Sequence, residues 1–290
     1  MDPNIVILAG GISSRMRKSV ASMADVDSAL RREAEEKPKS MIGIGGTKKP
    51  FLDYLLENIA SAGYRDVVIV VSDRDETIRE YYGRGGDGSL SKDLVLSFAV
   101  QRIPEGREKP LGTADALLQG LIAMPSWKGH RFSVCNSDNL YSVAALGLLL
   151  KDTHANATID YDRTALRFEH DRVGQFSVIR KDRDGFLVDI LEKPSSEEVS
   201  RAADAHGRVG VSMNIFRFSY DQILPFLETV PLHPLRQEKE LPTAVNMMVK
   251  QHPRSLYLLP VSEHVPDLTT LTDIASVRSF IDDSLSGRPR

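Results

Sequence analysis

The fold is decided near the N-terminus by the stretch Asn4-Ile-Val-Ile-Leu-Ala-Gly-Gly-Ile-Ser-Ser-Arg-Met16. Its apolar half predicts a short buried strand, which runs directly into a Gly-Gly-x-Ser-Ser-Arg turn. Gly10 and Gly11 lack side chains, so backbone N–H groups can approach phosphate oxygens, while the serine hydroxyls and Arg15 add further donors. The turn is predicted to hold a triphosphate, although a glycine pair alone is also typical of an ordinary tight turn.

Alternating strand and helix patterns follow this first strand. Residues 51–62 have the period of an amphipathic helix that ends at Gly63, and residues 67–72 are a β-branched run suited to a strand buried on both faces. The next expected elements are a helix over 76–82, a strand over 94–100, a helix over 113–123 and a strand over 132–135. This order predicts an α/β fold with a Rossmann-like, doubly wound, mostly parallel sheet.

The pattern changes after residue 150. We expect sheet segments over 163–168, 174–179, 186–191 and 210–218, a charged helix near 196–205, and helices over 220–227, 240–250 and 271–285. These segments predict a subregion inserted into the same sheet rather than a second fold.

Composition limits the class of protein. The 290 residues are 41% apolar and 27% charged, enough for a full core, and the formal net charge of −3 provides no basic field for nucleic acid. The single Cys135 excludes an intramolecular disulfide and a thiolate metal site. No secretory n-region and h-region and no apolar run near eighteen residues occur, so we expect a cytoplasmic protein without a membrane partner. The oligomeric state stays open, a homo-oligomer included.

Further motifs follow the first turn in a fixed order. They are Lys37-Pro-Lys39, Lys109-Pro-Leu-Gly-Thr-Ala-Asp-Ala116, Cys135-Asn-Ser-Asp-Asn139, Leu191-Glu-Lys-Pro194, Ser212-Met-Asn-Ile-Phe216 and Val265-Pro-Asp-Leu-Thr-Thr270. Together with the N-terminal turn, this set resembles the sugar-1-phosphate nucleotidyltransferases, also called nucleotide-sugar pyrophosphorylases. The chain departs from the family pattern at Gly-Ile-Ser-Ser-Arg-Met, at Asn136-Ser-Asp and at Asn214.

The resemblance implies a reaction and a division of the chain. A nucleotidyl group would pass from an NTP to a sugar 1-phosphate, giving an NDP-sugar and pyrophosphate with Mg²⁺ as the cofactor. Residues 1–290 would form one nucleotidyltransferase domain, with the nucleotide-binding part over 1–150 and the sugar-phosphate-binding part and C-terminal helices over 151–290. Neither the NTP nor the sugar is identified by the motifs.

The resemblance also assigns roles residue by residue. Arg15, Lys39 and Lys193 would be catalytic, and Asp138 and Asp267 would bind the metal. The nucleotide-binding set is Leu8, Ala9, Gly10, Gly11, Ser13, Ser14, Arg15, Lys39, Gly112, Thr113 and Ala114. The sugar-phosphate-binding set is Asn139, Gly174, Glu192, Lys193, Ser212 and Asn214.

Each of these residues also has an ordinary structural interpretation. Asp138 fits a turn or a helix cap, Thr113 fits the N-cap of a helix that begins at Ala114, and Gly174 fits a hairpin. Lys37 and Lys48 compete with Lys39 for the triphosphate. Glu192 and Lys193 would point to opposite faces of a strand unless the strand bends there, as Pro194 allows.

Two other functions use similar sequence features. A glycosyltransferase would normally show Asp-x-Asp where this chain has Ser137-Asp138-Asn139, and a catalytically silent sensor would not need both metal aspartates. The polar stretch 17–36 is predicted to be a mobile lid over the triphosphate, because it has no continuous apolar face; a passive surface insertion is the alternative.

Overall fold

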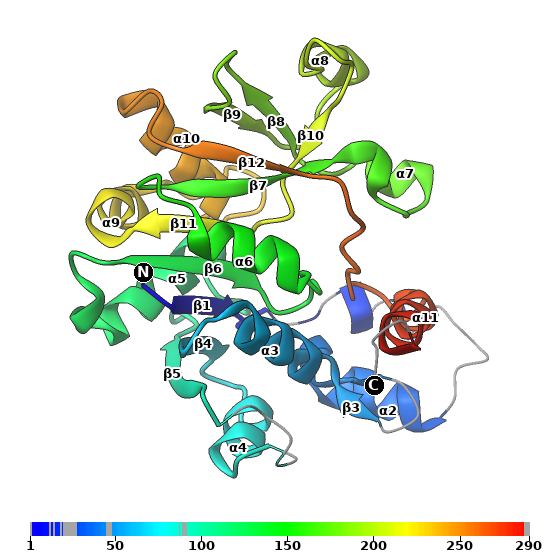
Figure 1. Cartoon of the computed structure of the whole chain (residues 1–290). Coiled ribbons are helices and arrows are strands. Elements are labelled where there is room, and N and C mark those ends of the chain that lie inside the picture. The colour runs from blue at the N-terminus through cyan, green and yellow to red at the C-terminus, as the bar shows by residue number, and fades with distance from the viewer. Residues whose placement is uncertain are drawn as a thin grey trace.

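A computed structural model describes residues 2–11, 13, 15–17, 19, 28–44, 48–86, 88 and 92–286 (Figure 1). The sheet is built around β1 (Asn4–Leu8), whose five residues are all buried. β1 pairs in parallel with β4 (Asp66–Ser72) and β6 (Arg131–Asn136), and β4 pairs in parallel with β5 (Val95–Gln101). This group has the order β5–β4–β1–β6, so each apolar run predicted in the first 150 residues forms an inner or edge strand of one parallel sheet.

The sheet continues beyond β6 with shorter strands from the second half of the chain. The additional strands are β7 (Ala157–Asp162), β8 (Val178–Lys181), β9 (Leu187–Leu191), β10 (Gly210–Val211), β11 (Phe216–Ser219) and β12 (Tyr257–Val261). β11 is antiparallel to both β6 and β7, and β12 lies parallel to β7. When the strand directions are taken from all of these pairings, seven of the ten strands in this sheet run in one direction. This confirms the predicted doubly wound, mostly parallel α/β fold.

Helices cover both faces of the sheet because the strand side chains alternate between two hydrophobic cores. Ile5 and Ile7 belong to one core, which includes the buried face of α3 (Phe51–Ala62), and Val6 and Leu8 belong to the other, which includes α5 (Thr113–Ala123). Figure 1 shows α3 and α6 in front of the strands and α5 behind. The remaining helices are α2 (Ser28–Glu36), α4 (Thr77–Gly83), α6 (Val143–Lys151), α7 (His170–Val173), α8 (Ser196–Arg201), α9 (Tyr220–Thr229), α10 (Leu241–Gln251) and α11 (Asp273–Ser286).

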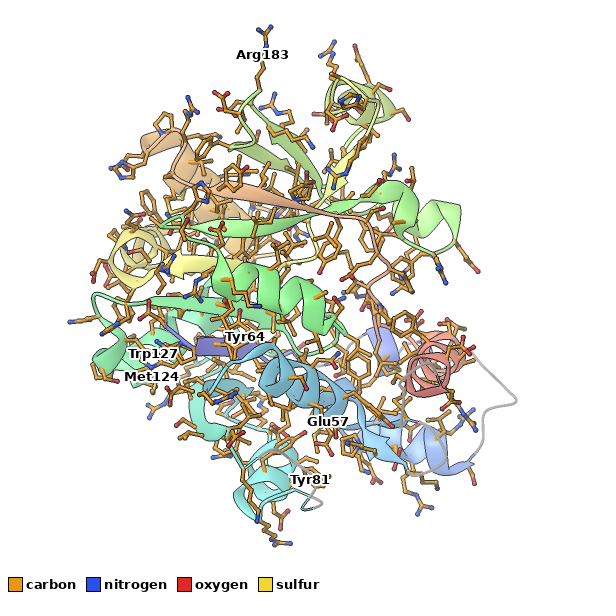
Figure 2. The ribbon with its side chains drawn as sticks, in the orientation of Figure 1. Glu57, Tyr64, Tyr81, Met124, Trp127 and Arg183 are labelled. Atoms are coloured by element: carbon orange, nitrogen blue, oxygen red, sulfur yellow. The ribbon has the colours of Figure 1, made fainter. Side chains whose placement is uncertain are left out.

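Large aromatic side chains fill these cores, together with the fully buried Arg217. Tyr64 is fully buried and Trp127 is 4% exposed, whereas Arg183 extends from the outer tip of the β8–β9 hairpin (Figure 2). Short elements complete the fold, namely the 3₁₀ turns at Lys39–Met41, Pro125–Trp127 and Arg163–Ala165 and the two-stranded sheet of β2 (Gly43–Ile44) and β3 (Lys49–Pro50). Among the described residues, no helix is both long enough and apolar enough to cross a membrane.

Several expected elements of the second half were wrong in position. The strand expected over 163–168 lies earlier, at β7, and its expected start is a 3₁₀ turn. The strand expected over 174–179 begins only at Val178, because α7 precedes Gly174. The strand expected over 210–218 is split into β10 and β11, since Asn214 has a φ of +54° and the main chain turns there.

The predicted lid over 17–36 is partly described. Residues 18 and 20–27 lie outside the described part of the chain. Residues 28–36 form α2, in which Ala34 is fully buried in the core and the Glu33 carboxylate accepts a hydrogen bond from Gly43 N at 3.3 Å. The expectation that nothing anchors this segment is therefore wrong for α2.

Candidate functional site

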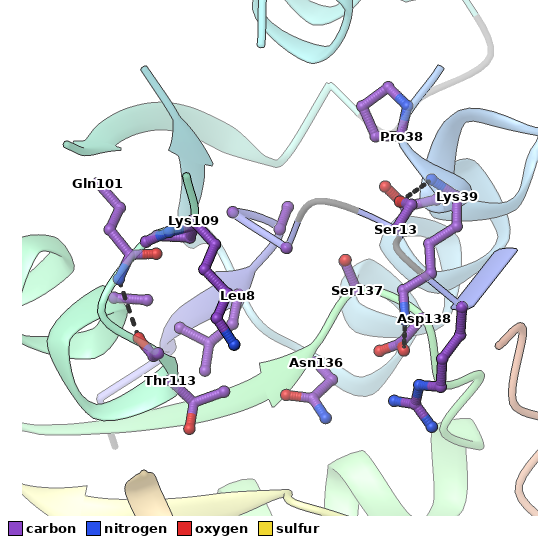
Figure 3. Close-up of a pocket in the computed structure, with 18 of the residues that line it drawn as sticks. Leu8, Ser13, Pro38, Lys39, Gln101, Lys109, Thr113, Asn136, Ser137 and Asp138 are labelled. Carbon is purple, nitrogen blue, oxygen red and sulfur yellow. Dashed lines mark hydrogen bonds and ion pairs between the residues drawn. The ribbon is translucent and has the colours of Figure 1, made fainter. Parts of the chain in front are cut away.

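A cavity of about 330 Å³ opens where the parallel strands end. Leu8, Gln101 and Asn136 are the last residues of β1, β5 and β6, and all three line it (Figure 3). Ligands of doubly wound sheets bind at the carboxyl ends of the strands, so this position is the expected one. The remaining lining residues are Ala9, Gly10, Gly11, Ser13, Arg15, Pro38, Lys39, Ser40, Lys109, Pro110, Gly112, Thr113, Ala116, Ser137, Asp138, Glu238 and Thr269.

Most of the nucleotide-binding residues expected from the sequence meet in this cavity. They include the described part of the glycine turn, Lys39, Gly112 and Thr113, together with the metal-site candidate Asp138. Ser14 lies outside the described residues, and Ala114 is fully buried and is not among the lining residues. The two competing lysines, Lys37 and Lys48, are not among the lining residues of this cavity.

Lys39 connects the N-terminal turn to the end of β6. Its main-chain N–H donates to Ser13 Oγ at 3.1 Å, and its ammonium group forms an ion pair with the carboxylate of Asp138 (Figure 3). The side chains of Lys39 and Asp138 are 19% and 14% exposed, so the pair lies in the cavity wall rather than in bulk solvent. In this arrangement both the ammonium group and the carboxylate are close enough to the cavity to act on a phosphate group bound there.

Asp138 and Asp267 are brought together by main-chain pairing. Leu268 N donates to Asp138 O at 2.8 Å and Leu140 N donates to Pro266 O at 2.9 Å, so the two segments lie antiparallel. Asn139 and Asp267 face each other in an isolated bridge. Burial, and then the nearby charge of Asp138, raises the pKa of the Asp267 carboxyl group above its ordinary value.

A second cation, Arg172, neutralises Asp267. Its Nη2 donates to Asp267 Oδ2 at 2.7 Å, and its Nη1 forms an ion pair with Asp273. The guanidinium carbon also lies 4.5 Å from the centroid of the Phe168 ring, in a cation–π contact. Arg172 stands two residues before Gly174 in the sequence, but only Gly174 received a role in the sequence analysis.

The loop before α5 is held by a close main-chain contact. Gly112 has a φ of +106°, and a Cβ atom on it would lie only 2.6 Å from Lys239 O. Gln101 Nε2 donates to Gly112 O at 2.9 Å and also to Asp115 at 2.7 Å. α5 begins at Thr113 without a side-chain cap, and the Thr113 hydroxyl instead accepts a hydrogen bond from Leu241 N, so its expected capping role is wrong.

The residues expected to bind the sugar phosphate are not among the residues that line this cavity. β9 ends at Leu191 and Lys193 has a φ of +48°, so the main chain bends here as the motif requires. Lys193 is exposed, while the Glu192 carboxylate forms an ion pair with Arg236. Asn139 and Ser212 are 5% exposed each, Asn214 N donates to Ser212 Oγ at 3.3 Å, and Gly174 follows α7.

Sequence reasoning left out several lining residues. Lys109, Pro110, Asn136 and Ser137 stood inside motifs already quoted but received no role. Thr269 also stood inside a quoted motif without a role, whereas Glu238 comes from a distant segment that no motif included, and only the tertiary fold reveals it. In the described part of the chain, no three His, Cys, Asp or Glu side chains gather in a group suited to hold a metal ion.

Comparison with known proteins gives one family. The model of the family described as "Nucleotidyl transferase" matches residues 34–283. Glucose-1-phosphate adenylyltransferase 1 of Vibrio cholerae is 25% identical over 191 residues, which are 66% of this chain and 43% of that protein. Glucose-1-phosphate adenylyltransferase of Koribacter versatilis is 23% identical over 226 residues, 77% of this chain and 49% of that protein. The chain thus spans about half the length of the curated relatives it matches.

Proposed function

Because the chain belongs to the nucleotidyl transferase family, we propose that it transfers a nucleotidyl group from an NTP to a sugar 1-phosphate and releases pyrophosphate. The observation that carries this proposal is the single cavity lined by the glycine turn, Lys39, Asp138 and the loop at Gly112. The names of the matched relatives, which are glucose-1-phosphate adenylyltransferases, support the same reaction type. The NTP and the sugar remain to be identified.

The proposed binding mode of the NTP follows from the two ends of the cavity. At one end Ser13 and Lys39 lie together (Figure 3), and Gly10, Gly11 and Arg15 also line the cavity, so main-chain N–H groups and positive charge are available for the triphosphate. At the other end, the loop at Gly112 offers compact main chain against which a nucleobase can lie. Arg15 and Lys39 would neutralise charge on pyrophosphate as it leaves.

Asp138 and Asp267 are the proposed ligands for Mg²⁺. Their carboxylate oxygens are the hard donors that this ion prefers, and both lie at paired main-chain segments beside the cavity. Each is paired with one basic side chain, Lys39 or Arg172, so a divalent cation would compete with these side chains for the carboxylate oxygens. When bound, Mg²⁺ would supply charge neutralisation to the phosphates.

The proposed sugar side lies in the second part of the chain. We assign the sugar 1-phosphate to Lys193 and the sugar hydroxyls to Glu192, with Gly174, Ser212 and Asn214 as further contacts. Asn139 is the one proposed contact from the first part, and the single domain is proposed to divide near residue 150. Lys193 is exposed and can reach a phosphate without breaking an ion pair that the described structure shows.

The buried free thiol of Cys135 suits a reducing compartment, and the cytoplasm is the proposed location.

The proposed step is a direct displacement. An oxygen of the sugar phosphate attacks the α-phosphorus of the NTP, the new P–O bond forms as the bond from the α-phosphorus to the bridging oxygen breaks, and the electron pair leaves with pyrophosphate. No covalent intermediate with the protein is required, so the residues act by positioning the two anions and stabilising the charge that develops.

A pyrophosphate-release assay tests the function. It would be run as a matrix of the common NTPs against hexose and heptose 1-phosphates, with glucose 1-phosphate and ATP as the first pair because of the matched relatives. Pyrophosphate formed only when both substrates are present supports the proposal. A protein that uses a finished nucleotide-sugar would release none, and a silent sensor would show a thermal shift without product; either result would reject it.

A further inference from the structure

The segment between α9 and α10, residues 230–240, contacts both proposed substrate sites. We infer that this segment, called here the α9–α10 connector, couples NTP binding to sugar-phosphate binding, with Arg236 as the positioning residue that links the connector to Glu192. The inference rests on the proposed function, because it concerns the two substrates assigned there. It assigns a role to residues that none of the sequence motifs included.

At the nucleotide end, the connector is bonded to the loop before α5 through main chain. Lys239 N donates to Leu111 O at 2.5 Å, and Lys239 O accepts from Ala114 N at 2.9 Å. The same carbonyl is the atom that excludes a side chain at Gly112. A displacement of Lys239 therefore displaces the proposed nucleobase loop with it.

Side chains strengthen this end of the connector. Lys109 Nζ lies 2.5 Å from Glu238 Oε1, and both residues line the nucleotide cavity. Arg107 also donates to the main-chain carbonyl of Gln237. The connector thus forms one wall of the cavity rather than a remote support.

At the sugar end, two carboxylates converge on one guanidinium. Arg236 forms an ion pair with Glu192, and it also contacts Glu240, with 2.7 Å from Nη2 to Oε2. The Glu240 side chain is only 10% exposed, and burial followed by the charge of Glu192 raises the pKa of its carboxyl group. Without Arg236 the two carboxylates would repel each other, so Arg236 sets the position of the Glu192 side chain.

The connector is internally bonded between these two ends. His233 N donates to Glu238 O at 2.8 Å, Gln237 N donates to His233 O at 2.8 Å, and the His233 ring accepts from Arg236 N at 3.2 Å. Arg236 therefore lies within a hydrogen-bonded turn over residues 233–238, and Lys239 directly follows the end of that turn. A contiguous bonded unit of this kind can transmit a shift at one site to the other, which is the physical requirement for coupled binding.

The test is an equilibrium binding experiment on the full chain. The dissociation constant of α,β-methylene-ATP, whose α–β bridge cannot be cleaved, is measured by calorimetry with Mg²⁺, first alone and then at saturating glucose 1-phosphate. We expect the sugar phosphate to tighten nucleotide binding about fivefold or more in the wild-type protein. Arg236→Gln should reduce this factor to less than about twofold, since an amide cannot hold two carboxylates.

Matched variants separate coupling from a general loss of structure. Arg236→Lys keeps the charge but can reach only one carboxylate, so we expect a factor between those of wild type and Arg236→Gln. Arg201→Ala removes an exposed arginine that also pairs with a glutamate, Glu197, and it should keep the wild-type factor. Thermal melts of all four proteins would show whether each is folded.

Two results would overturn the inference. One is a wild-type factor below about twofold, including the case in which either probe fails to bind; the other is an unchanged factor in a folded Arg236→Gln. The pyrophosphate matrix is scored separately. Pyrophosphate release without coupling leaves the proposed function standing and rejects the connector, whereas coupling without pyrophosphate release rejects the transferase and leaves the connector standing.

Discussion

Arg172 binds Asp267 at the edge of the proposed active site, with 2.7 Å between Nη2 and Oδ2. Asp267 lies beside Asp138 through the pairing of their main chains, and Asp138 is neutralised by Lys39. The two carboxylates proposed for Mg²⁺ thus each carry a basic partner, one from the N-terminal part of the chain and one from the second part. The two basic side chains offset the repulsion between the carboxylates of Asp138 and Asp267, which would otherwise disfavour placing them close together.

Asp138→Asn should abolish turnover and the dependence on divalent cations together. An amide is an uncharged and poor ligand for Mg²⁺, so the rate should fall more than NTP binding does. Steady-state kinetics with a Mg²⁺ titration would measure this, with the exposed Asp184→Asn as a control. A variant that keeps more than about a tenth of wild-type kcat, a difference under ~1.4 kcal/mol, would show that Asp138 is not a direct ligand. The same criterion applies to Asp267→Asn.

Arg172→Gln should make the protein less stable and more responsive to Mg²⁺. Losing a charged hydrogen-bond partner from Asp267 should lower the free energy of unfolding by about 1–3 kcal/mol. Added Mg²⁺ can replace the missing positive charge, so it should raise the Tm of the variant more than that of wild type. Thermal melts with and without Mg²⁺ measure both effects. Equal Mg²⁺ shifts in the two proteins would argue against a metal at Asp267.

Lys193→Ala should affect the two substrates unequally. If Lys193 contacts the sugar phosphate, its loss should raise the KM for the sugar phosphate by about 10–100-fold, as expected for a charge-assisted contact of roughly 1.5–3 kcal/mol. The KM for the NTP should change much less. Initial rates at varied concentrations of each substrate provide the comparison, and Lys151→Ala, another exposed lysine, is the control. Equal changes in both KM values would refute the division into two sites.

The first half of the fold could be predicted from sequence because its signals are local. The β-branched run of β4 and the helix ending at Gly63 each depend on residues within one element. In the second half, strands of two to six residues leave too few positions for a period to be recognised. β7 was therefore placed too late along the chain and β12 was not assigned. The nine-residue helix α6 was also not assigned.

The site was predicted to the extent that its residues lie in motifs. The glycine turn and Asp138 could be found beside predicted strand ends, and Lys39 and Gly112 could be found within the quoted motifs. Arg172 and Arg236 act through partners about 95 and 44 positions away, and no local pattern specifies those pairings. Contacts between residues so far apart in the sequence can be identified only from the tertiary structure.

His264 should make stability depend on pH below neutrality. Its Nδ1 accepts a hydrogen bond from Arg167 N at 3.1 Å, which only the neutral ring can do, and its ring lies against Phe168 and Phe280. Burial, followed by the charges of Arg167 and Arg172, lowers the pKa of His264 from 6.5 to about 4. The folded state therefore binds its proton less readily than the unfolded chain does.

The sign of the His264 effect follows from this difference. Its contribution is fully present above pH 6.5 and is lost as the pH falls from 6.5 through about 4. Because the ring is only partly buried, we expect the free energy of unfolding to fall by about 1–2 kcal/mol, less than the whole pKa difference would give. Urea unfolding from pH 7 to pH 4 would measure it. His264→Gln should show a shallower slope than wild type, while the exposed His206→Gln should not, and identical slopes in all three proteins would reject the assignment.

Gly112→Ala should damage both stability and nucleotide binding, because two costs coincide at this position. Gly112 has a φ of +106° and a ψ of −174°, a conformation almost restricted to glycine, and its Cβ would lie 2.6 Å from Lys239 O. Gly129→Ala is the matched control, since its φ is +78° but a Cβ there would meet no atom within 4 Å.

The control should lose about 1 kcal/mol of unfolding free energy, the cost of the backbone conformation alone. Gly112→Ala should lose about 2–4 kcal/mol, since the main chain at Lys239 must also move. The KM for the NTP should rise more than about tenfold in Gly112→Ala and stay near the wild-type value in Gly129→Ala. Denaturant unfolding and initial-rate kinetics on both variants provide the comparison. Equal losses of stability in the two variants would mean that the contact with Lys239 does not constrain this loop.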